Sequence, residues 1–418
     1  MSESVLDLAE RLWRGDGEPP GLINVSNDLV EVGDDTGFLW SMANVATFRT
    51  DDGLVLVDTG SSFMAGAIHA AIRGWTDLPL HTAVYSHGHI DHVFGVGAFE
   101  AEGNAAHVVA HENVRARFDR YSLTAGYNSI INQRQFGMPN LTWPTTYRYP
   151  DETYRDQLTV EEGGETFELH HAKGETDDHT WTWVPARKVL CTGDFFIWAS
   201  PNAGNPQKVQ RFPREWAAAL REMSSLGAEI LLPGHGVPIT GAGRIREALS
   251  DTAELLESIH DQTLALMNEG ATLDTIVHEV KPPQHLLDRP YLRPTYDDPE
   301  FIVRNVWRLY GGWWDGDPAT LKPAPREDLA RELADLAGGA GRLAARARDL
   351  AKEGNLRLAG HLAELAATAS EREYETRAEV NEARAQEETS LMAKNIFAWA
   401  ARASEFQVRE LRRKGDAT

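Results

Sequence analysis

Three histidines and an aspartate occur within six residues of this chain, in the segment His87-Gly88-His89-Ile90-Asp91-His92 that follows the apolar run Ala83-Val84-Tyr85. Neutral imidazole nitrogens and carboxylate oxygens are ligands that Zn²⁺ and related divalent ions prefer. Because side chains alternate along extended backbone, His87 and His89 would point to one side, and a turn would aim Asp91 and His92 elsewhere. This spacing predicts a metal site with two neighbouring ions rather than one. The alternative is a polar loop whose histidines hydrogen-bond to the backbone.

The length and the charge of the chain limit what it can be. With 418 residues it is long enough for two or more domains, each with a substantial core. A formal net charge of −22 argues against nucleic acid as a partner, because proteins bind phosphate backbones through Lys and Arg. A small anionic substrate stays compatible with this charge, since bound metal ions can dominate the local field.

The single cysteine and the apolar runs bear on the location of the protein. Cys191 is the only cysteine, so an internal disulfide is impossible and the cytoplasm is the expected compartment. The first ten residues carry acids where a signal peptide needs a basic start and an apolar run. No apolar stretch approaches the ~20 residues of a membrane-spanning helix, so we expect no membrane segment.

The first half of the chain alternates short apolar runs with amphipathic segments. Strands are expected near residues 44–49, 54–60, 83–86, 107–110, 157–160, 165–171, 181–194 and 229–236, and helices near 61–74 and 213–225. Fully apolar strands between helices are typical of a layered α/β domain. We therefore predict an αβ/βα sandwich over about residues 20–245. The aromatic segment 120–150 is expected to be an irregular loop over a pocket.

After residue 243 the pattern changes to amphipathic helices with little strand character. Helices are expected over residues 244–268, 326–336, 339–353, 356–370, 371–389 and 391–413. Short connections between them predict an antiparallel, repeat-like helical bundle, and a Trp-bearing helical appendage favours an oligomer contact. The expected division is a domain of residues 1–245 followed by an all-α domain of residues 246–418.

Two further candidate ligands follow apolar runs elsewhere in the first domain. Asp194 comes after Val189-Leu190-Cys191-Thr192-Gly193, where a carboxylate held at the sheet edge can bridge two cations; the alternative is a helix N-cap. His235 lies in Pro233-Gly234-His235-Gly236, where the glycines allow a tight turn; the alternative is a buried structural histidine.

Taken in order, these motifs resemble the metallo-β-lactamase superfamily. The residues that carry the resemblance are Asp58-Thr59-Gly60, His87 to His92, Thr192-Gly193-Asp194 and Pro233-Gly234-His235-Gly236. Most members have a histidine in a Gly-His-Thr turn, whereas this chain reads Lys173-Gly174-Glu175-Thr176. The alkyl sulfatase branch has a glutamate there and carries a helical dimerisation domain. The segment 310–323, with Trp313-Trp314-Asp315-Gly316, looks similar to the signature of that domain.

The resemblance implies a set of metal ligands. One Zn²⁺ would take His87, His89 and Glu175, the second would take Asp91, His92 and His235, and Asp194 and a hydroxide would bridge them. Fe or Mn could replace zinc. His179 is the competitor of Glu175 for its place, and His170 and His171 are neighbours that would not bind metal. Asp58 would anchor the metal loop, and Asp91 would hold the nucleophile and take its proton.

The function expected from this resemblance is a dinuclear metal-dependent hydrolase acting on sulfate esters of small or medium alcohols, as a homodimer formed through the helical domain. A lactonase, thioesterase or phosphodiesterase on the same metals is the alternative enzyme, and a metal-stabilised dimeric scaffold is the non-catalytic alternative. The chain departs from the family in leaving no room for a C-terminal lipid-carrier-like domain. Lys208 and Arg211 are the candidates for the family's sulfate-binding arginine, although a solvated loop charge is the alternative.

Overall fold

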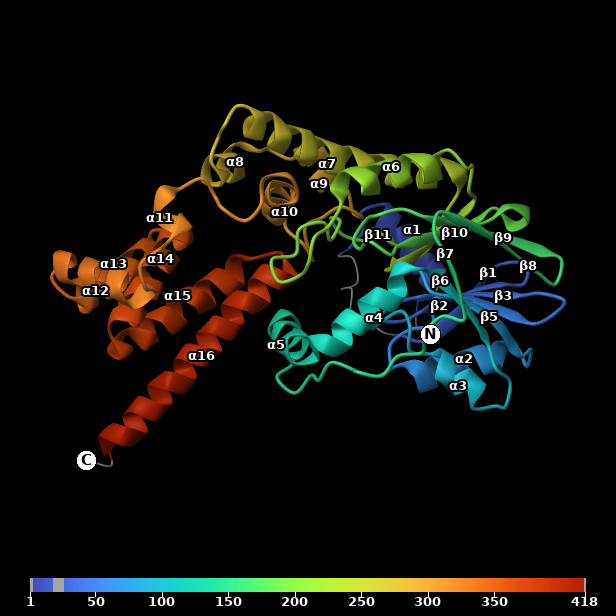
Figure 1. Ribbon diagram of the computed structural model, residues 1–418, viewed down its shortest axis with the longest axis horizontal. Coiled ribbons are helices and arrows are strands. Elements are labelled where there is room, and N and C mark those ends of the chain that lie inside the picture. The colour runs from blue at the N-terminus through green and yellow to red at the C-terminus, as the bar shows by residue number, and fades with distance from the viewer. Residues whose placement is uncertain (1–2, 18–25, 417–418) are drawn as a thin grey trace. The chain divides into compact units, whose positions relative to one another are not determined.

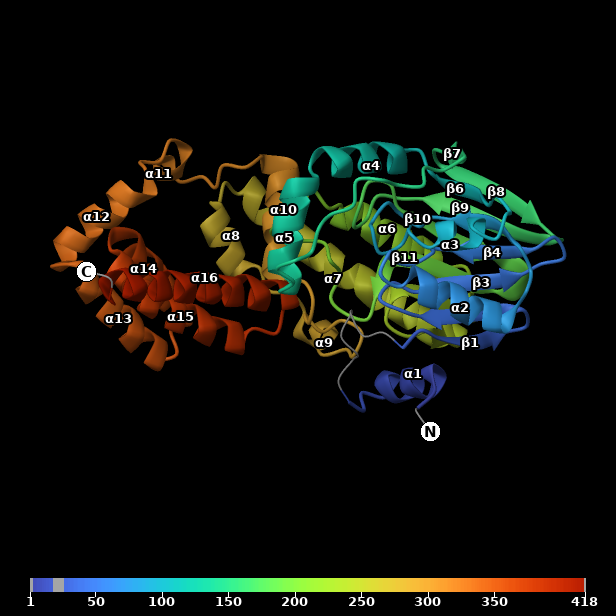
Figure 2. The ribbon, with the colours of Figure 1, turned by 90° about the horizontal axis from the view of Figure 1, so that it is seen from below.

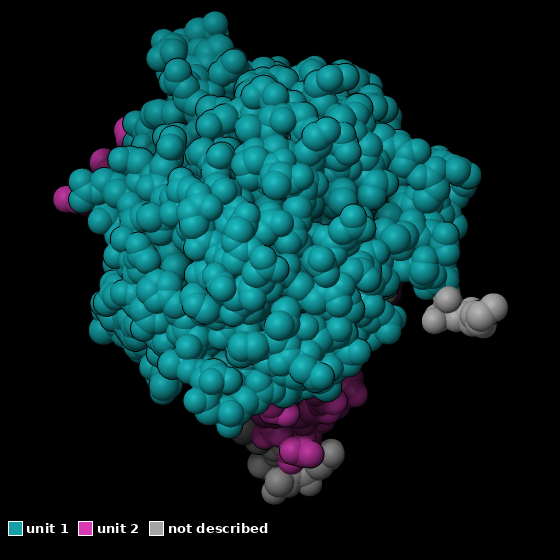
Figure 3. Space-filling view, turned by 90° about the vertical axis from the view of Figure 1, so that its right-hand side faces the viewer, with its two compact units in different colours: residues 1–128, 142–313 teal, residues 129–141, 314–418 magenta. Residues whose placement is uncertain are grey.

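The computed structural model describes residues 3–17 and 26–416. The chain divides into two compact units, Met1–Asn128 with Thr142–Trp313 and Ser129–Leu141 with Trp314–Thr418, which Figure 3 distinguishes by colour. A short helix, α1 (Val5–Trp13), precedes the sheets of the first unit. Ser4 caps this helix by accepting a hydrogen bond from Asp7 N.

A seven-stranded sheet forms the first half of the first unit. Its strands lie in chain order: β1 (Asp28–Gly33), β2 (Thr36–Trp40), β3 (Val45–Arg49), β4 (Leu54–Val57), β5 (Leu80–Val84), β6 (His107–His111) and β7 (Glu152–Tyr154). The pairs from β1 to β4 are antiparallel, and those from β4 to β7 are parallel. Parallel pairing needs crossovers, which α2 (Ala65–Trp75), α3 (Val96–Glu100) and α4 (Asn113–Leu123) provide.

A six-stranded sheet forms the second half of this unit. Its spatial order is β13 (Ile239–Thr240), β12 (Ile230–His235), β11 (Val189–Ile197), β10 (Thr180–Val184), β9 (Glu165–His171) and β8 (Gln157–Glu162). Only the pair β11–β12 is parallel within this sheet, and α6 (Pro213–Ser224) connects its two strands. The short helix η1 (Pro185–Arg187) links β10 to β11.

The two sheets pack face to face, with helices on both outer faces. Helices α2 and α3 cover the first sheet, and α6 with α7 (Ala242–Asn268) covers the second, as Figures 1 and 2 show. Every residue of β4 and of β11 is buried, as expected for strands covered on both faces. Between the sheets, Phe48 of β3 meets Phe167 of β9 edge to face, with ring centroids 5.3 Å apart. The predicted αβ/βα sandwich is confirmed.

Three more helices follow α7 within the first unit: α8 (Leu273–Glu279), α9 (Gln284–Leu287) and α10 (Pro299–Gly311). Their apolar side chains, among them Ile276, Leu286, Ile302 and Val306, belong to the same core as the sheets. The packing therefore groups residues up to Trp313 with the sandwich, whereas the sequence placed a domain boundary after residue 245.

The second unit contains a run of helical segments joined by short connections: α11 (Pro318–Leu321), α12 (Arg326–Ala337), α13 (Ala340–Lys352), α14 (Leu356–Ala369), η2 (Glu371–Glu373), α15 (Tyr374–Glu387) and α16 (Leu391–Asp416). Its small core consists of Ala347, Leu350, Ala359, Ala363 and Val380, so helices of high alanine content pack closely. Gly338 ends α12 in the left-handed region at φ 86°. An all-α region after the sandwich is confirmed, with helix boundaries close to those predicted.

The prediction of an irregular segment over residues 120–150 is wrong for its first half. Helix α4 runs to Leu123, and α5 (Ala125–Phe136) follows after Thr124. The apolar residues of α5 do not form a regular stripe, because most of its side chains are small or polar, so the helical period is hidden in the sequence. Residues 142–150 form neither helix nor strand, as expected. None of the described helices is long and apolar enough to span a bilayer.

Candidate metal centre

The segment with three histidines leaves the end of β5 and turns back towards β4. The turn is closed by His92 N, which donates to His89 O at 3.1 Å, and Thr59 N donates to His92 O at 2.7 Å. These bonds tie the loop to the strand end that carries Asp58. His87 and His92 are fully buried, and the side chain of His89 is 16% exposed.

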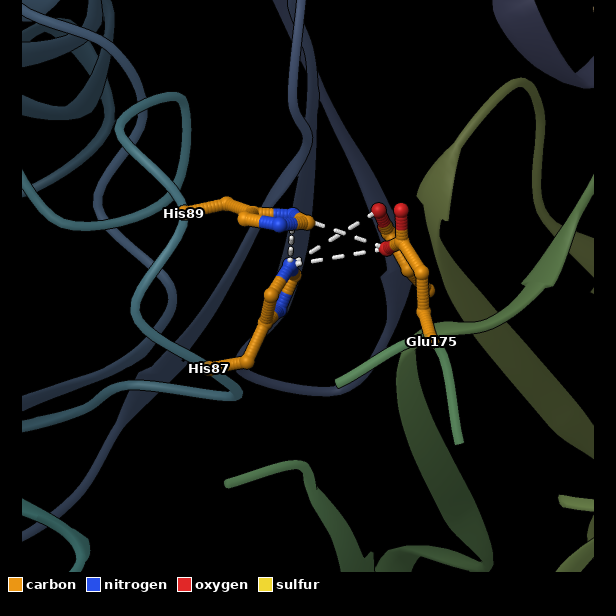
Figure 4. A group of neighbouring side chains, drawn as sticks. His87, His89 and Glu175 are labelled. Carbon is orange, nitrogen blue, oxygen red and sulfur yellow. Dashed lines mark hydrogen bonds and ion pairs between the residues drawn. The ribbon is translucent and has the colours of Figure 1, made fainter. Parts of the chain in front are cut away.

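Four side chains from three parts of the chain form the first ligand group: His87, His89, Glu175 and Asp194. Figure 4 shows the rings of His87 and His89 facing the carboxylate of Glu175. Glu175 Oε2 lies 3.8 Å from His87 Nε2 and 3.5 Å from His89 Nδ1. The two imidazoles also share a hydrogen bond of 2.7 Å between His87 Nε2 and His89 Nδ1, which a shared metal ion would replace.

Three side chains form the second group: Asp91, His92 and His235. Asp91 Oδ2 lies 3.7 Å from His92 Nε2 and 3.4 Å from His235 Nε2. His235 Nδ1 donates to Met42 O at 2.6 Å, so its Nε2 is the nitrogen aimed at the group.

Asp194 reaches both groups. Its Oδ2 lies 3.8 Å from His87 Nε2 and 3.5 Å from His235 Nε2, while its Oδ1 lies 3.5 Å from His92 Nε2. The residue lies inside β11 rather than at the start of a helix, so the N-cap alternative does not hold. Gly234 on β12 lies against it, because a Cβ there would collide with Asp194 Oδ1.

The polar atoms of the seven side chains are spaced for binding metal ions rather than for hydrogen bonds to one another. His92 Nε2, Glu175 Oε2 and Asp194 Oδ1 are buried and have no hydrogen-bond partner among the described residues. Such orphaned polar atoms are costly unless a ligand satisfies them. The nitrogen–oxygen distances of 3.4–3.8 Å are too long for hydrogen bonds. Two ligands bonded at about 2.0–2.2 Å to one tetrahedral ion lie about 3.3–3.6 Å apart.

The protonation states differ between the two groups. Burial, together with His179 and His92, holds the pKa of His87 well below its usual value, so this imidazole is neutral. Burial opposes the charged forms of His92 and His235, but neighbouring carboxylates outweigh it. Asp58 and Asp194 raise the pKa of His92 well above its usual value, and Asp194 raises the pKa of His235 to about 10. Without metal, His92 and His235 of the second group are therefore protonated at neutral pH.

The two buried carboxylates also differ. Burial raises the pKa of Glu175 to about 8, although Arg211 acts against this. Burial by itself would also raise the pKa of Asp194, but His235 and His92 outweigh this and hold that pKa well below its usual range. Of these two carboxylates, Asp194 is thus the one that is charged at neutral pH.

Asp58 anchors the metal loop. Its Oδ1 accepts from Ser86 N at 2.7 Å, and its Oδ2 accepts from Ser86 Oγ at 2.8 Å and from His92 Nδ1 at 2.7 Å. Ser86 Oγ in turn lies 2.9 Å from His87 Nδ1. One carboxylate thereby fixes both the loop backbone and the ring orientation of a candidate ligand, in the manner of groups that support metal ligands.

Three other residues that support the cluster were not identified from the sequence. Asn202 Nδ2 donates to Glu175 Oε1. The fully buried Asp178 accepts from Gly88 N at 3.0 Å and from Arg117 Nε at 2.6 Å, so it holds the metal loop from the side of α4. Nothing in the spacing of these residues indicates a role, since each lies in a segment without a recognisable ligand pattern.

The other histidines near the cluster, His170, His171 and His179, belong to neither of the two ligand groups. His179 Nε2 accepts from Asp194 N at 3.0 Å, so that nitrogen supports the backbone of Asp194. His170 stacks on Trp181, with ring centroids 4.0 Å apart, and His171 stacks on His111 at 3.6 Å. The His179 ring stacks on that of His87, with centroids 4.3 Å apart, but Glu175 rather than His179 offers a ligand atom to the first group.

The two candidate substrate-binding cations lie on the loop that follows β11. Arg211 is buried, donates to Glu175 O, and has its Nη1 3.2 Å from Glu175 Oε1. Lys208 Nζ lies 5.3 Å from the ring centroid of Trp143, and burial, reinforced by Arg211, lowers the pKa of Lys208 to about 7. Arg211 therefore contacts a candidate metal ligand directly, whereas Lys208 lies beside Trp143 and is only half-buried.

Two protein families match separate parts of the chain. Residues 39–235 match the family described as Metallo-beta-lactamase superfamily, and residues 272–406 match the family described as Alkyl sulfatase dimerisation. A linear primary-alkylsulfatase from a Pseudomonas species is 29% identical over 74% of this chain and 64% of its own length. An (R)-specific secondary-alkylsulfatase from Pseudomonas is 28% identical over 77% of this chain and 53% of its own length. The chain thus spans less than two thirds of these relatives.

A solved structure has the same fold. The stereoselective inverting sec-alkylsulfatase Pisa1 from Pseudomonas superposes with a TM-score of 0.82 over 94% of this chain and 70% of its own, at 23% identity. The similarity therefore extends through both the sandwich and the helices that follow it.

Proposed function

Because this chain joins a domain of the metallo-beta-lactamase superfamily to an alkyl sulfatase dimerisation domain, we propose that it is a metal-dependent hydrolase of sulfate esters. The observation that carries the proposal is the convergence of seven ligand side chains into two adjoining groups that share Asp194. The alkylsulfatases among its relatives support the choice of sulfate esters over other esters.

The proposed ligands of a first Zn²⁺ are His87, His89 and Glu175, and those of a second are Asp91, His92 and His235, with Asp194 between them. Two divalent cations would supply a hydroxide at neutral pH by lowering the pKa of water from ~15.7 towards ~7, and would offset the charge of the ester. Iron or manganese would suit the same nitrogen and oxygen donors. Elemental analysis of the purified protein distinguishes these metals.

The protein side chains would transfer the proton, bind the sulfate group and exclude water. Asp91 is proposed to hold the attacking water and to accept its proton on the carboxylate group. Burial opposes ionisation of Asp91, but His92 and His235 outweigh it and lower its pKa, so an unprotonated acceptor is present at neutral pH. Lys208 and Arg211 are proposed to bind the sulfate group. The aromatic side chains of Tyr121 and Trp143, with ring centroids 5.2 Å apart, would limit the access of water from the side of His89.

The test is a substrate panel. Zinc-loaded protein should release inorganic sulfate from alkyl or aryl sulfates, and the release should stop when a chelator removes the metal. Lactones, thioesters and phosphodiesters are assayed beside them. Turnover of one of these without any sulfate release would replace the sulfatase assignment with that activity. A folded protein that purifies with almost no metal would favour a scaffold instead.

Two further proposals concern the state of the protein in the cell. The dimerisation domain supports a homodimer formed through the helical unit. Residues 1–245 as the catalytic domain and residues 246–418 as the dimerisation domain remain our proposed division by function. A cytoplasmic location remains a prediction from the single cysteine.

A further inference from the structure

The loop between β11 and α6 holds Glu175 from two sides. Asn202, near its start, donates to Glu175 Oε1, and Arg211, at its end, donates to Glu175 O. Residues 199–212 contain no helix or strand. A loop without regular structure depends on contacts from outside for a fixed conformation, so the position of Glu175 depends on whatever holds this loop.

The start of the loop is held by Asp297, which is fully buried just before α10. One carboxylate oxygen of Asp297, Oδ2, accepts from Gly204 N at 2.6 Å, and both oxygens lie 3.3 Å from Asn205 N. Gly204 packs directly on the backbone of Phe301, so a Cβ at this position would collide with it. The turn after Asn202 is therefore pressed onto the first residues of α10.

The end of the loop is held by Asn305, a buried residue in the middle of α10. Arg211 N donates to Asn305 Oδ1 at 3.2 Å, and Asn305 Nδ2 donates to Arg211 O at 3.0 Å. This reciprocal pair satisfies both backbone groups of Arg211, as a neighbouring strand would. Gln210 Nε2 also donates to Asn305 Oδ1 at 3.0 Å.

The helix is also held by apolar packing that is separate from these polar contacts. Its apolar residues Ile302, Val303 and Val306 are buried in the core of the first unit. Asp297 and Asn305 make their side-chain bonds mainly to the loop, whose two ends carry the partners of Glu175. These hydrogen bonds to the loop backbone satisfy its buried polar groups and also fix the path of the loop.

We propose that Asp297 and Asn305 are positioning residues for the metal ligand Glu175, acting through Asn202 and Arg211. The proposal rests on the metal site proposed above. Both residues lie in the part of the chain that matches the alkyl sulfatase dimerisation family, residues 272–406. That part would then complete the metal site within one chain, in addition to any role in association.

The test measures metal binding rather than hydrolysis, using the full-length protein. Zn²⁺ stoichiometry and affinity are measured by competition with a chromogenic chelator, and the Co²⁺-loaded protein reports ligand geometry through its visible absorption spectrum. Groups that support metal ligands typically change affinity by about 10–100-fold. Asn305 acts on Glu175 only through Arg211, so we expect an effect at the lower end of this range. Asn305→Ala should lower the affinity for one of the two metal equivalents about tenfold and alter the Co²⁺ spectrum. Asp297→Asn retains shape and one acceptor, so its effect should be smaller.

Val303→Ala is the matched control, because Val303 is buried on the same helix but belongs to the apolar core. It should lower the melting temperature and leave both metal equivalents and the spectrum unchanged. If Asn305→Ala does not fold, the metal affinity and spectrum of Asp297→Asn are compared with those of the wild type instead. Wild-type affinity and spectrum in both variants would refute the positioning role alone. A wild-type chain that binds no metal would refute the metal site and this proposal together.

Discussion

Replacing Asp58 by asparagine tests how far the metal loop depends on one carboxylate. The residue has φ 61°, a left-handed conformation that asparagine tolerates better than most residues, so the backbone should be retained. The amide keeps one acceptor, which can serve Ser86 N. Its NH₂ group then faces His92 Nδ1, where the carboxylate accepted a hydrogen bond of 2.7 Å. In the neutral form that can bind a metal, the imidazole is then expected to carry its proton on Nε2, the nitrogen aimed at the metal, instead of on Nδ1.

The expected magnitude follows from the number of bonds affected. Asp58 accepts three hydrogen bonds of 2.7–2.8 Å, two from Ser86 and one from His92. Loss of a partner that orients a metal ligand typically lowers affinity about 10–100-fold, which is about 1.4–2.7 kcal/mol. We expect Asp58→Asn to weaken the metal equivalent bound by His92 by this amount and to weaken the other equivalent less.

The assay is titration of the metal-free protein with Zn²⁺ in competition with a chromogenic chelator. Asp151→Asn is a matched control. The Asp151 side chain also accepts a backbone hydrogen bond, from Val108 N at 2.9 Å, but it lies at the opposite end of the strands from the metal loop. The control should bind both equivalents as the wild type does. Equal affinity of Asp58→Asn and wild type for both equivalents would refute the anchoring role of Asp58.

Five further outcomes are expected. Asp194→Ala removes a side chain that reaches both ligand groups, so metal analysis should show loss of both equivalents and hydrolysis should fall to background; retained metal would contradict bridging. His235 has a pKa of about 10 in the metal-free protein, so zinc uptake at pH 7 should release protons, seen by calorimetry in buffers of different ionisation enthalpy; no buffer dependence would contradict this. Because the pKa of His235 is raised, the charged imidazole should stabilise the metal-free protein fully below pH ~6.5, and this contribution should be lost as the pH rises towards 10. Denaturant unfolding of the metal-free protein at several pH values measures this loss. Chelation should lower the melting temperature, since free zinc at 100 times Kd adds about 2.7 kcal/mol per site. Sedimentation of the full chain should give about twice the chain mass, and a monomer at micromolar concentration would contradict the proposed dimer.

The sequence by itself determined the features that are encoded locally. The apolar runs of β4 and β11 and the helical periodicity from Arg326 onwards predict the sandwich and the helices, because secondary structure follows short-range patterns. The segment from His87 to His92 places four candidate ligands in one loop, so it is recognisable without a fold. Asp194 and His235 become candidates because each follows an apolar run, and the resemblance of the surrounding motifs to a known family adds Glu175 as the third distant candidate.

Only the tertiary structure decided which residues hold those ligands. Asn202, Asp297 and Asn305 are isolated polar residues with no periodic pattern around them, and the hydrogen bonds of Asp297 and Asn305 join segments about 90 residues apart. A sequence pattern reports neighbours along the chain, whereas a hydrogen-bond partner is chosen by which backbone groups become buried together. For the same reason the assignment of α10 to the first unit, beside the loop that supports Glu175, emerges only when the apolar faces of the helices and sheets pack into one core.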